Sequence, residues 1–167
     1  MKSLPTQNNA RGFSRLILWI ATGFGLGYAP VASGTFGSLP GILIVLALAH
    51  QPLKIQILCA VAMALLAVPI CGHAEEKFGR KDDGRIVADE YLTFLICTLG
   101  LPWQEHPWVW LGIAFVTNRV LDIIKPPPAR QAQSLTGGLG IVMDDVLSCL
   151  YALGVNHGLW WAAQRWL

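Results

Sequence analysis

The residues of this chain best suited to chemistry are acidic, and they stand beside long apolar segments. Six of them fall into three short groups along the chain: Asp82, Asp89, Glu90, Asp122, Asp144 and Asp145. Clustered carboxylates cannot all stay ionised without a cation, and oxygen ligands without His or Cys suit Mg²⁺. All six are therefore candidate magnesium ligands, and all of them except Asp82 are also candidate catalytic residues.

Two cations near the second acidic group would complete a site for phosphate. Asn118, Arg119, Asp122 and Lys125 are spaced i, i+1, i+4 and i+7, which places them on one stripe of a helix. Beside a hard metal, Arg119 and Lys125 would neutralise the oxygens on which charge collects during phosphoryl transfer. A structural salt bridge from Arg119 to Asp122 or Asp145 is the alternative, but one such pair leaves a surplus of negative charge.

Two glycine-rich stretches could add backbone amides to this site. The string GTFGS at 34–38 offers two hydroxyls before an apolar segment, and a Gly-Gly pair precedes the last one. Glycine lets the backbone approach a ligand closely, and a helix that begins there directs free amides at an anion. Taken alone, the first string is explained more simply as a loop that caps a helix. The candidate phosphate-binding residues are Thr35, Ser38, Arg119, Lys125, Gly137 and Gly138.

The charged groups interrupt a chain that is otherwise suited to a membrane. Hydrophobic residues make up 54% of its 167 residues and charged residues 13%, against roughly 25% charged in soluble proteins. A spanning helix needs about 20 mostly apolar residues. A soluble helical protein with a large core is the alternative. We expect one all-α domain, 1–167, a polytopic membrane protein with about five spanning helices at 39–50, 55–72, 86–101, 107–124 and 142–163.

The positive charges predict which side of the membrane holds the site. They cluster at 2–15, at 77–85 and at 119–130, and clusters of this kind stay in the cytoplasm. Residues 1–15 would then form a polar cytoplasmic tail. An even number of crossings must separate the first two clusters, and two predicted spans already supply it. We therefore expect 16–29 to lie in the interface or to enter the membrane and return, as a segment buried in protein can.

Other chemistries find little support in the sequence. The four cysteines all lie in apolar segments without metal-ligand spacing, so they are expected to be small hydrophobic residues. The histidines are scattered, and no Ser-His-Asp arrangement or phosphate loop of the Walker type is present. The expected partners are a membrane and a phospholipid, with no nucleic acid, and the oligomeric state stays open.

Four strings in one order carry a resemblance to a known family. The strings GTFGS, DDGRIVADE, NRVLDIIKP and GGLGIVMDD, between about Gly23 and Ala152, resemble phosphatidylglycerophosphatase A. The resemblance implies a bacterial inner-membrane enzyme that removes the terminal phosphate of phosphatidylglycerophosphate to leave phosphatidylglycerol. It further implies Mg²⁺ dependence and a site facing the cytoplasmic leaflet, the face that the positive charges also indicate.

The resemblance can be carried over by position, with departures. The residues that match the family's motifs are Asp82, Asp89, Glu90, Arg119, Asp122, Lys125, Pro126, Gly137, Gly138, Asp144 and Asp145. Asn118 stands where the family usually has an aromatic residue, Thr93 where it has a small Gly, and Ser148-Cys149 where it has Ala-Gly. An acidic residue expected between the prolines and Gly137 is missing. These departures concern helix packing and substrate detail more than the reaction.

The sequence leaves two mechanisms open for such a phosphatase. Water activated by the metal and a carboxylate could attack phosphorus, or an Asp could form a covalent aspartyl-phosphate. The number of metal ions and the tolerance for phosphatidic or lysophosphatidic acid are also open. A small ion- or proton-coupled transporter is the alternative function, because carboxylates in membrane helices also mark ion paths. A structural subunit whose charges pair with a partner chain is the third.

Overall fold

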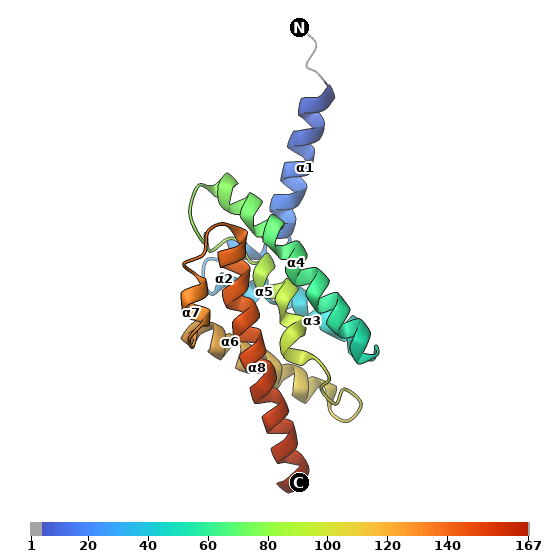
Figure 1. The fold of residues 1–167 in the computed structure, drawn as a ribbon. Helices are drawn as coiled ribbons and strands as arrows, with labels where there is room; N and C mark the ends of the chain where they lie inside the picture. The colour runs from blue at the N-terminus through green and yellow to red at the C-terminus, as the bar shows by residue number, and fades with distance from the viewer. Residues whose placement is uncertain (1–4, 167) are drawn as a thin grey trace.

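The computed structural model describes residues 5–166 and the side chains of residues 11–165, and its regular structure in that range is helical (Figure 1). The elements in chain order are α1 (Pro5–Ala21), η1 (Leu26–Tyr28), α2 (Ser33–Gly37), α3 (Leu39–Leu48), α4 (Leu53–Phe78), α5 (Ala88–Thr93), η2 (Phe94–Thr98), α6 (Pro107–Ile124), α7 (Ala129–Ala132) and α8 (Gly138–Trp166). The expectation of an all-α chain is confirmed for these residues.

Three of these helices are long and apolar enough to cross a membrane. They are α4, α6 and α8, and they correspond to the spans predicted at 55–72, 107–124 and 142–163. The prediction of five spanning helices is therefore wrong for the described residues. The two segments that fail are 39–50 and 86–101.

The two failed spans are too short, and one of them is part of the protein core. Helix α3 has 10 residues, or about 15 Å at 1.5 Å per residue, half the thickness of the hydrocarbon. The segment 86–101 forms α5 and the 3-10 helix η2, with Phe94, Leu95 and Cys97 no more than 2% exposed. Neighbouring helices surround this segment, so its apolar residues meet protein and not lipid.

The long helices α4 and α6 each end just before a residue with a left-handed backbone conformation. At the end of α4, Gly79 takes a left-handed conformation with φ 66° and turns the chain into the loop before α5. Helix α6 ends at Ile124, and the next residue, Lys125, is also left-handed with φ 47°. Pro126, Pro127 and Pro128 follow, and a proline inside a helix would lack the amide that the ladder needs. Both helix ends therefore lie where the charged residues are.

The N-terminal segment packs at the end of the molecule where α4 stops and α8 starts. The Val87 amide donates to the Ala21 carbonyl at 2.9 Å, and the Tyr91 hydroxyl donates to the Ile20 carbonyl at 2.9 Å. Figure 1 shows α1 at the end where α4 stops and α8 starts, with the C-terminus at the opposite end. Residues 5–15 of the expected polar tail, 1–15, are helical and belong to α1, and residues 1–4 lie outside the described residues. That this tail is cytoplasmic stays a prediction. Whether 16–29 enters a membrane stays a prediction.

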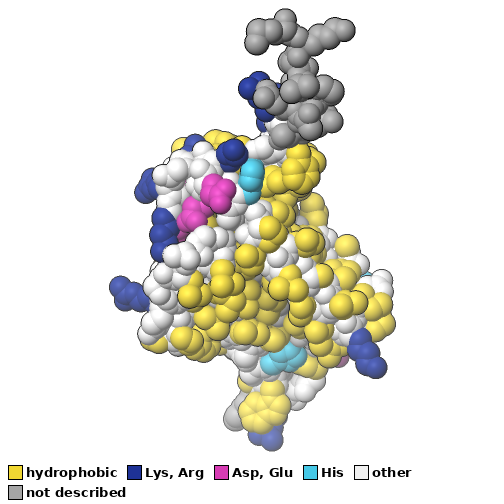
Figure 2. Space-filling model, turned by 45° about the horizontal axis from the view of Figure 1, so that its top comes forward, with side chains coloured by type: hydrophobic (Ala, Val, Ile, Leu, Met, Phe, Trp, Pro, Cys, Tyr) yellow, Lys and Arg dark blue, Asp and Glu magenta, His cyan; other side chains and the backbone are white. Residues whose placement is uncertain are grey.

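Charge is distributed unevenly over the surface. Figure 2 shows most of the visible Lys, Arg, Asp and Glu side chains gathered toward the upper end of one face, with hydrophobic side chains prominent below them. Exposed hydrophobic residues include Leu58, Leu65 and Leu66 on α4 and Ile123 on α6, each more than half exposed. Such surface is typical of a chain whose helices contact lipid.

Candidate active site

Five of the six predicted acidic residues come together where three helices meet. Asp89 and Glu90 occupy the first turn of α5, Asp122 lies in the last turn of α6, and Asp144 and Asp145 lie near the start of α8. Helix α8 packs against both α5 and α6. We call these five residues the carboxylate cluster.

Two cations of α6 tie the cluster together across helices. The Arg119 Nη1 atom lies 2.8 Å from Glu90 Oε2 and 3.0 Å from Asp122 Oδ2. Lys125 Nζ lies 3.8 Å from Asp122 Oδ1 and also contacts Asp144 Oδ2. The predicted salt bridge of Arg119 with Asp122 is present, and among the described ion pairs none joins Arg119 to Asp145. Both cations are therefore shared between carboxylates of different helices.

The glycine-rich string at 34–38 forms one wall of this site. An added Cβ at Gly34 would lie 2.1 Å from Glu90 Oε1 and 2.8 Å from Arg119 Nη2, so a larger residue here would displace the ends of these two side chains. The Ser38 hydroxyl is fully buried and lies 2.9 Å from Glu90 Oε2 and 2.8 Å from the Gly34 carbonyl. Ser38 thus orients Glu90, and its predicted contact with phosphate stays a prediction.

The cluster carries more negative charge than its cations balance. Asp89, Asp144 and Asp145 are each no more than 7% exposed. One oxygen of each, Asp89 Oδ1, Asp144 Oδ1 and Asp145 Oδ2, is buried without a hydrogen-bond partner. Burying a carboxylate oxygen without a partner is costly, so these atoms fit an added cation. No three acidic, His or Cys side chains of the described residues are already arranged around one metal position, and the ligand set stays a prediction.

Burial also changes the acidity of the two carboxylates on α5. Burial raises the pKa of Glu90 to about 7, although the Arg119 charge and the Ser38 hydroxyl act in the opposite direction. Burial, followed by the charges of Glu90 and Asp144, raises the pKa of Asp89 well above its usual value. The two groups are therefore suited to holding a proton near neutral pH or to binding a cation.

The sixth predicted ligand, Asp82, lies at the edge of the cluster. Its side chain is exposed, its φ is 48°, and its amide donates to Glu75 Oε1 at 3.2 Å. The Asp82 charge contributes to the raised pKa of Asp89, although it makes a smaller contribution than Glu90 and Asp144 do. Asp82 thus lies near the cluster, but among the described contacts it forms no ion pair with a residue of the cluster.

The remaining predicted phosphate ligands are less closely tied to the cluster. Thr35 lies half-buried on α2, and no hydrogen bond of its hydroxyl occurs among the described contacts. Gly137 is left-handed with φ 67°. A Cβ at Gly138 would lie 1.9 Å from the Val68 carbonyl oxygen, so Gly138 is required for the close approach of α8 to α4.

Three of the positions that depart from the family pattern contact one another. The Cys149 Sγ lies 3.1 Å from Asn118 Oδ1 and 3.6 Å from Thr93 Oγ1, and all three residues are buried. Thr93 of α5, Asn118 of α6 and Cys149 of α8 therefore fill the contact between these three helices.

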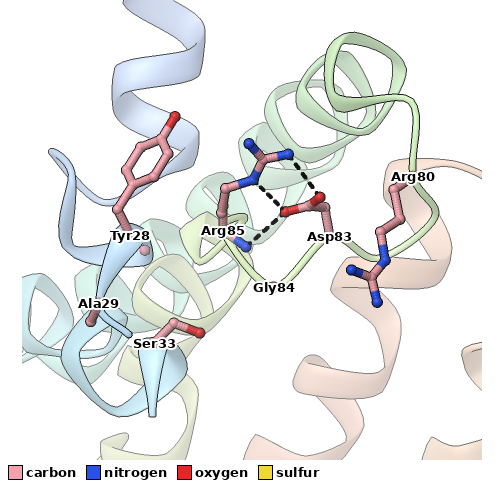
Figure 3. Close-up of a pocket in the computed structure, with 8 residues that line it drawn as sticks. Tyr28, Ala29, Ser33, Arg80, Asp83, Gly84 and Arg85 are labelled. Atoms are coloured by element: carbon pink, nitrogen blue, oxygen red, sulfur yellow. Dashed lines mark hydrogen bonds and ion pairs between the residues drawn. The ribbon is translucent and has the colours of Figure 1, made fainter. Parts of the chain in front are cut away.

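An ion pair that the sequence did not predict borders a polar pocket. Asp83 is 6% exposed, and its two oxygens lie 2.7 and 2.9 Å from Nε and Nη2 of Arg85 (Figure 3). The hydrogen bonds from Arg85 lower the pKa of Asp83. The pocket has a volume of about 530 Å³ and is lined by Tyr28, Ser33 and Arg80 besides this pair. The Asp-Gly-Arg string was a signal for a turn closed by its own side chains.

Comparison with known proteins gives consistent matches over most of the chain. The sequence model of the family described as Phosphatidylglycerophosphatase A matches residues 19–160. Phosphatidylglycerophosphatase A of Escherichia coli (strain K12) is 31% identical over 148 residues, covering 88% of this chain and 83% of that protein. The Haemophilus influenzae protein of the same name is 37% identical over 150 residues, covering 89% and 88%.

A third relative bears another name. A Bacteroides thetaiotaomicron protein with the provisional name of phosphatidylinositol-3-phosphatase is 34% identical over 144 residues, covering 83% of this chain and 90% of that protein. No solved structure matches the chain significantly. All three relatives are named as phosphatases of phosphorylated lipids, and none as a transporter.

Proposed function

Because the chain belongs to the phosphatidylglycerophosphatase A family, we propose that it hydrolyses the terminal phosphate of phosphatidylglycerophosphate, leaving phosphatidylglycerol and inorganic phosphate. The observation that carries the proposal is the carboxylate cluster, with Arg119 and Lys125 held among five acidic groups. The transporter alternative is not favoured, since the relatives are named as phosphatases.

The donor set of the cluster suits Mg²⁺. The unpartnered oxygens of Asp89, Asp144 and Asp145 are the first candidates to hold the ion, with Glu90 and Asp122 beside them and Asp82 at the edge. They are hard oxygen donors without His or Cys, the set that magnesium prefers. When bound, the ion would neutralise charge on the phosphate oxygens.

Arg119 and Lys125 are the proposed phosphate-binding residues. Each is now shared between carboxylates, and Arg119 Nε is buried without a hydrogen-bond partner. Arg119 therefore has a donor to spare for a phosphate oxygen, as a planar guanidinium suits. Gly34 lies directly against Glu90 and Arg119 and so forms the wall of the site beside this pair.

For the chemical step we propose that water attacks phosphorus in line with the leaving alkoxide. A carboxylate of the cluster accepts the proton of the water, the P–O bond to glycerol breaks, and the alkoxide takes up a proton. Glu90 is suited to this proton transfer because its pKa is raised to about 7. An aspartyl-phosphate formed on an Asp of the cluster and then hydrolysed is the second proposed route.

We further propose that the site faces the cytoplasmic leaflet of a bacterial inner membrane. The basic clusters at 77–85 and 119–130 flank the carboxylate cluster, and positive loops stay in the cytoplasm. With α4, α6 and α8 in the bilayer, the acyl chains of the substrate could remain in the leaflet while its headgroup enters the site.

Release of inorganic phosphate from phosphatidylglycerophosphate in detergent micelles tests the proposal. Purified wild type and Asp145→Asn would be compared with Mg²⁺ and with EDTA, and phosphatidylinositol 3-phosphate would serve as the competing substrate. We expect release that needs Mg²⁺, prefers phosphatidylglycerophosphate and is lost in the variant. Release that is unchanged by EDTA would refute the proposed Mg²⁺ requirement. A preference for the inositol lipid would refute phosphatidylglycerophosphate as the substrate.

A further inference from the structure

A polar pocket beside the carboxylate cluster takes no part in the reaction proposed above. It has a volume of about 530 Å³, and its charged lining residues are Arg80, Asp83 and Arg85. Two cations against one carboxylate leave one positive charge in excess. The pocket is therefore suited to a singly charged anion.

Asp83 and Arg85 pair with each other in the pocket, whereas Arg80 makes no ion pair among the described residues. Asp83 is buried and holds Arg85 through two hydrogen bonds of 2.7 and 2.9 Å. Figure 3 shows the Arg85 guanidinium turned onto Asp83, with Arg80 extending on the other side of this carboxylate. Arg80 is exposed and makes no ion pair among the described residues. Arg80 can therefore bind an anion without breaking an existing contact.

The pocket and the carboxylate cluster adjoin at two consecutive residues. Ser33 lines the pocket, and the next residue, Gly34, lies directly against Glu90 and Arg119. Consecutive Cα atoms are about 3.8 Å apart. A ligand with two anionic groups joined by a short linker could therefore reach both places at once.

We propose that this pocket binds the inner, phosphodiester phosphate of the lipid headgroup, with Arg80 as the specificity-determining residue. This assignment rests on the proposed function and deepens it. The two phosphates of phosphatidylglycerophosphate are joined by a three-carbon glycerol unit. The terminal phosphate meets Arg119 and Lys125 while the singly charged diester meets Arg80. A lipid with only a terminal phosphate, such as phosphatidic acid, leaves the pocket unused.

Arg80→Gln tests the proposal, with Arg130→Gln as the matched control. Arg130 is also an exposed arginine, on α7, and lines none of the pockets described. For wild type and both variants, we would measure kcat and KM on phosphatidylglycerophosphate and the inhibition constant of phosphatidic acid as a competitor. The inhibition constant is defined whether or not the competitor is itself hydrolysed.

We expect Arg80→Gln to raise the KM for phosphatidylglycerophosphate about tenfold, because a hydrogen bond to a charged group is lost. Both kcat and the inhibition constant of phosphatidic acid should stay unchanged. Arg80→Lys, which keeps the charge, should recover most of the affinity, and Arg130→Gln should match wild type. Equal weakening of both lipids, or no change in KM, would overturn the subsite while wild-type turnover still supports the phosphatase. Absence of turnover in folded wild type would overturn both.

Discussion

Two buried polar regions of this molecule, one in the N-terminal half of α8 and one in its C-terminal half, are constructed in opposite ways. The region we call the amide layer consists of Gln56, Asn156 and His157. Gln56 donates to the carbonyls of Ala49 and Gln51 at 3.3 and 2.9 Å and accepts from the Gly100 amide at 3.2 Å. The carboxylate cluster, in contrast, is charged and leaves several buried oxygens without a partner.

The other two residues of the amide layer also have hydrogen-bond partners. Asn156 donates to the Cys97 carbonyl at 2.8 Å and accepts from the Thr117 hydroxyl at 2.7 Å. His157 Nε2 lies 2.8 Å from the Leu99 carbonyl. These polar groups satisfy backbone groups at the end of η2 and in the connection between α3 and α4, so they stabilise the fold. Unsatisfied buried charge destabilises a fold and persists where a ligand or a reaction requires it.

The largest effect is expected from Asp145→Asn. The change keeps the shape of the side chain and removes one charge of the cluster, so activity should fall by roughly a hundredfold to a thousandfold. The melting temperature in detergent should hold or rise, because a buried charge is lost. Phosphate release and thermal unfolding of the same preparation measure both. Glu76→Gln, an exposed acid on α4, is the control, and an Asp145→Asn variant with a tenth of wild-type activity would contradict the assignment.

A dependence of stability on pH should come from Glu90. Its pKa in the fold is about 7 against a usual 4.5, so between these values the native state holds a proton that the unfolded state has released. Stability should therefore fall as the pH rises from 4.5 to 7, by up to about 3 kcal/mol, and Glu90 should add no further change above 7. Unfolding midpoints measured in EDTA should change less with pH in Glu90→Gln than in wild type. An equal dependence on pH in both proteins would refute the raised pKa of Glu90.

Gly34→Ala should lower activity, whereas the same change at Gly154, away from the site, should affect only stability. The added methyl group would meet Glu90 Oε1 at 2.1 Å and displace the pair with Arg119, so kcat/KM should fall about tenfold or more. Gly154→Ala on α8, where an added Cβ meets nothing within 4 Å, should keep activity and stabilise the helix by about 0.5–1 kcal/mol. Similar kinetics for both variants would show that the wall at Gly34 is not part of the site.

The sequence predicted the parts of the site that depend on helical spacing. The stripe from Arg119 to Lys125 is local, and the ion pairs of Arg119 with Asp122 and Lys125 with Asp122 follow from it. Partners across helices were not predictable in this way. The contact of Ser38 with Glu90 and the approach of Gly138 to α4 depend on tertiary packing, which a single stretch of sequence does not contain.

The error in the number of spanning helices has the same origin. Phe94 and Leu95 are as apolar as the residues of α4, but they face neighbouring helices, whereas Leu65 and Leu66 are more than half exposed. Hydropathy reports only that a residue avoids water, and a residue does so equally in a protein core and in lipid. Buried polar residues within 86–101, such as Thr93 and Thr98, were the available signal that this segment has protein on every side.

The smallest effect is expected in the amide layer, and it concerns stability alone. Asn156→Leu keeps the approximate volume and removes the bonds to the Cys97 carbonyl and the Thr117 hydroxyl, at about 1 kcal/mol. Thr117→Val removes only the second bond and should cost less. Because neither residue touches the carboxylate cluster, kcat per folded molecule should match wild type in both. Loss of turnover in Asn156→Leu at unchanged stability would mean that the amide layer also serves the reaction, and the contrast between the two regions would fail.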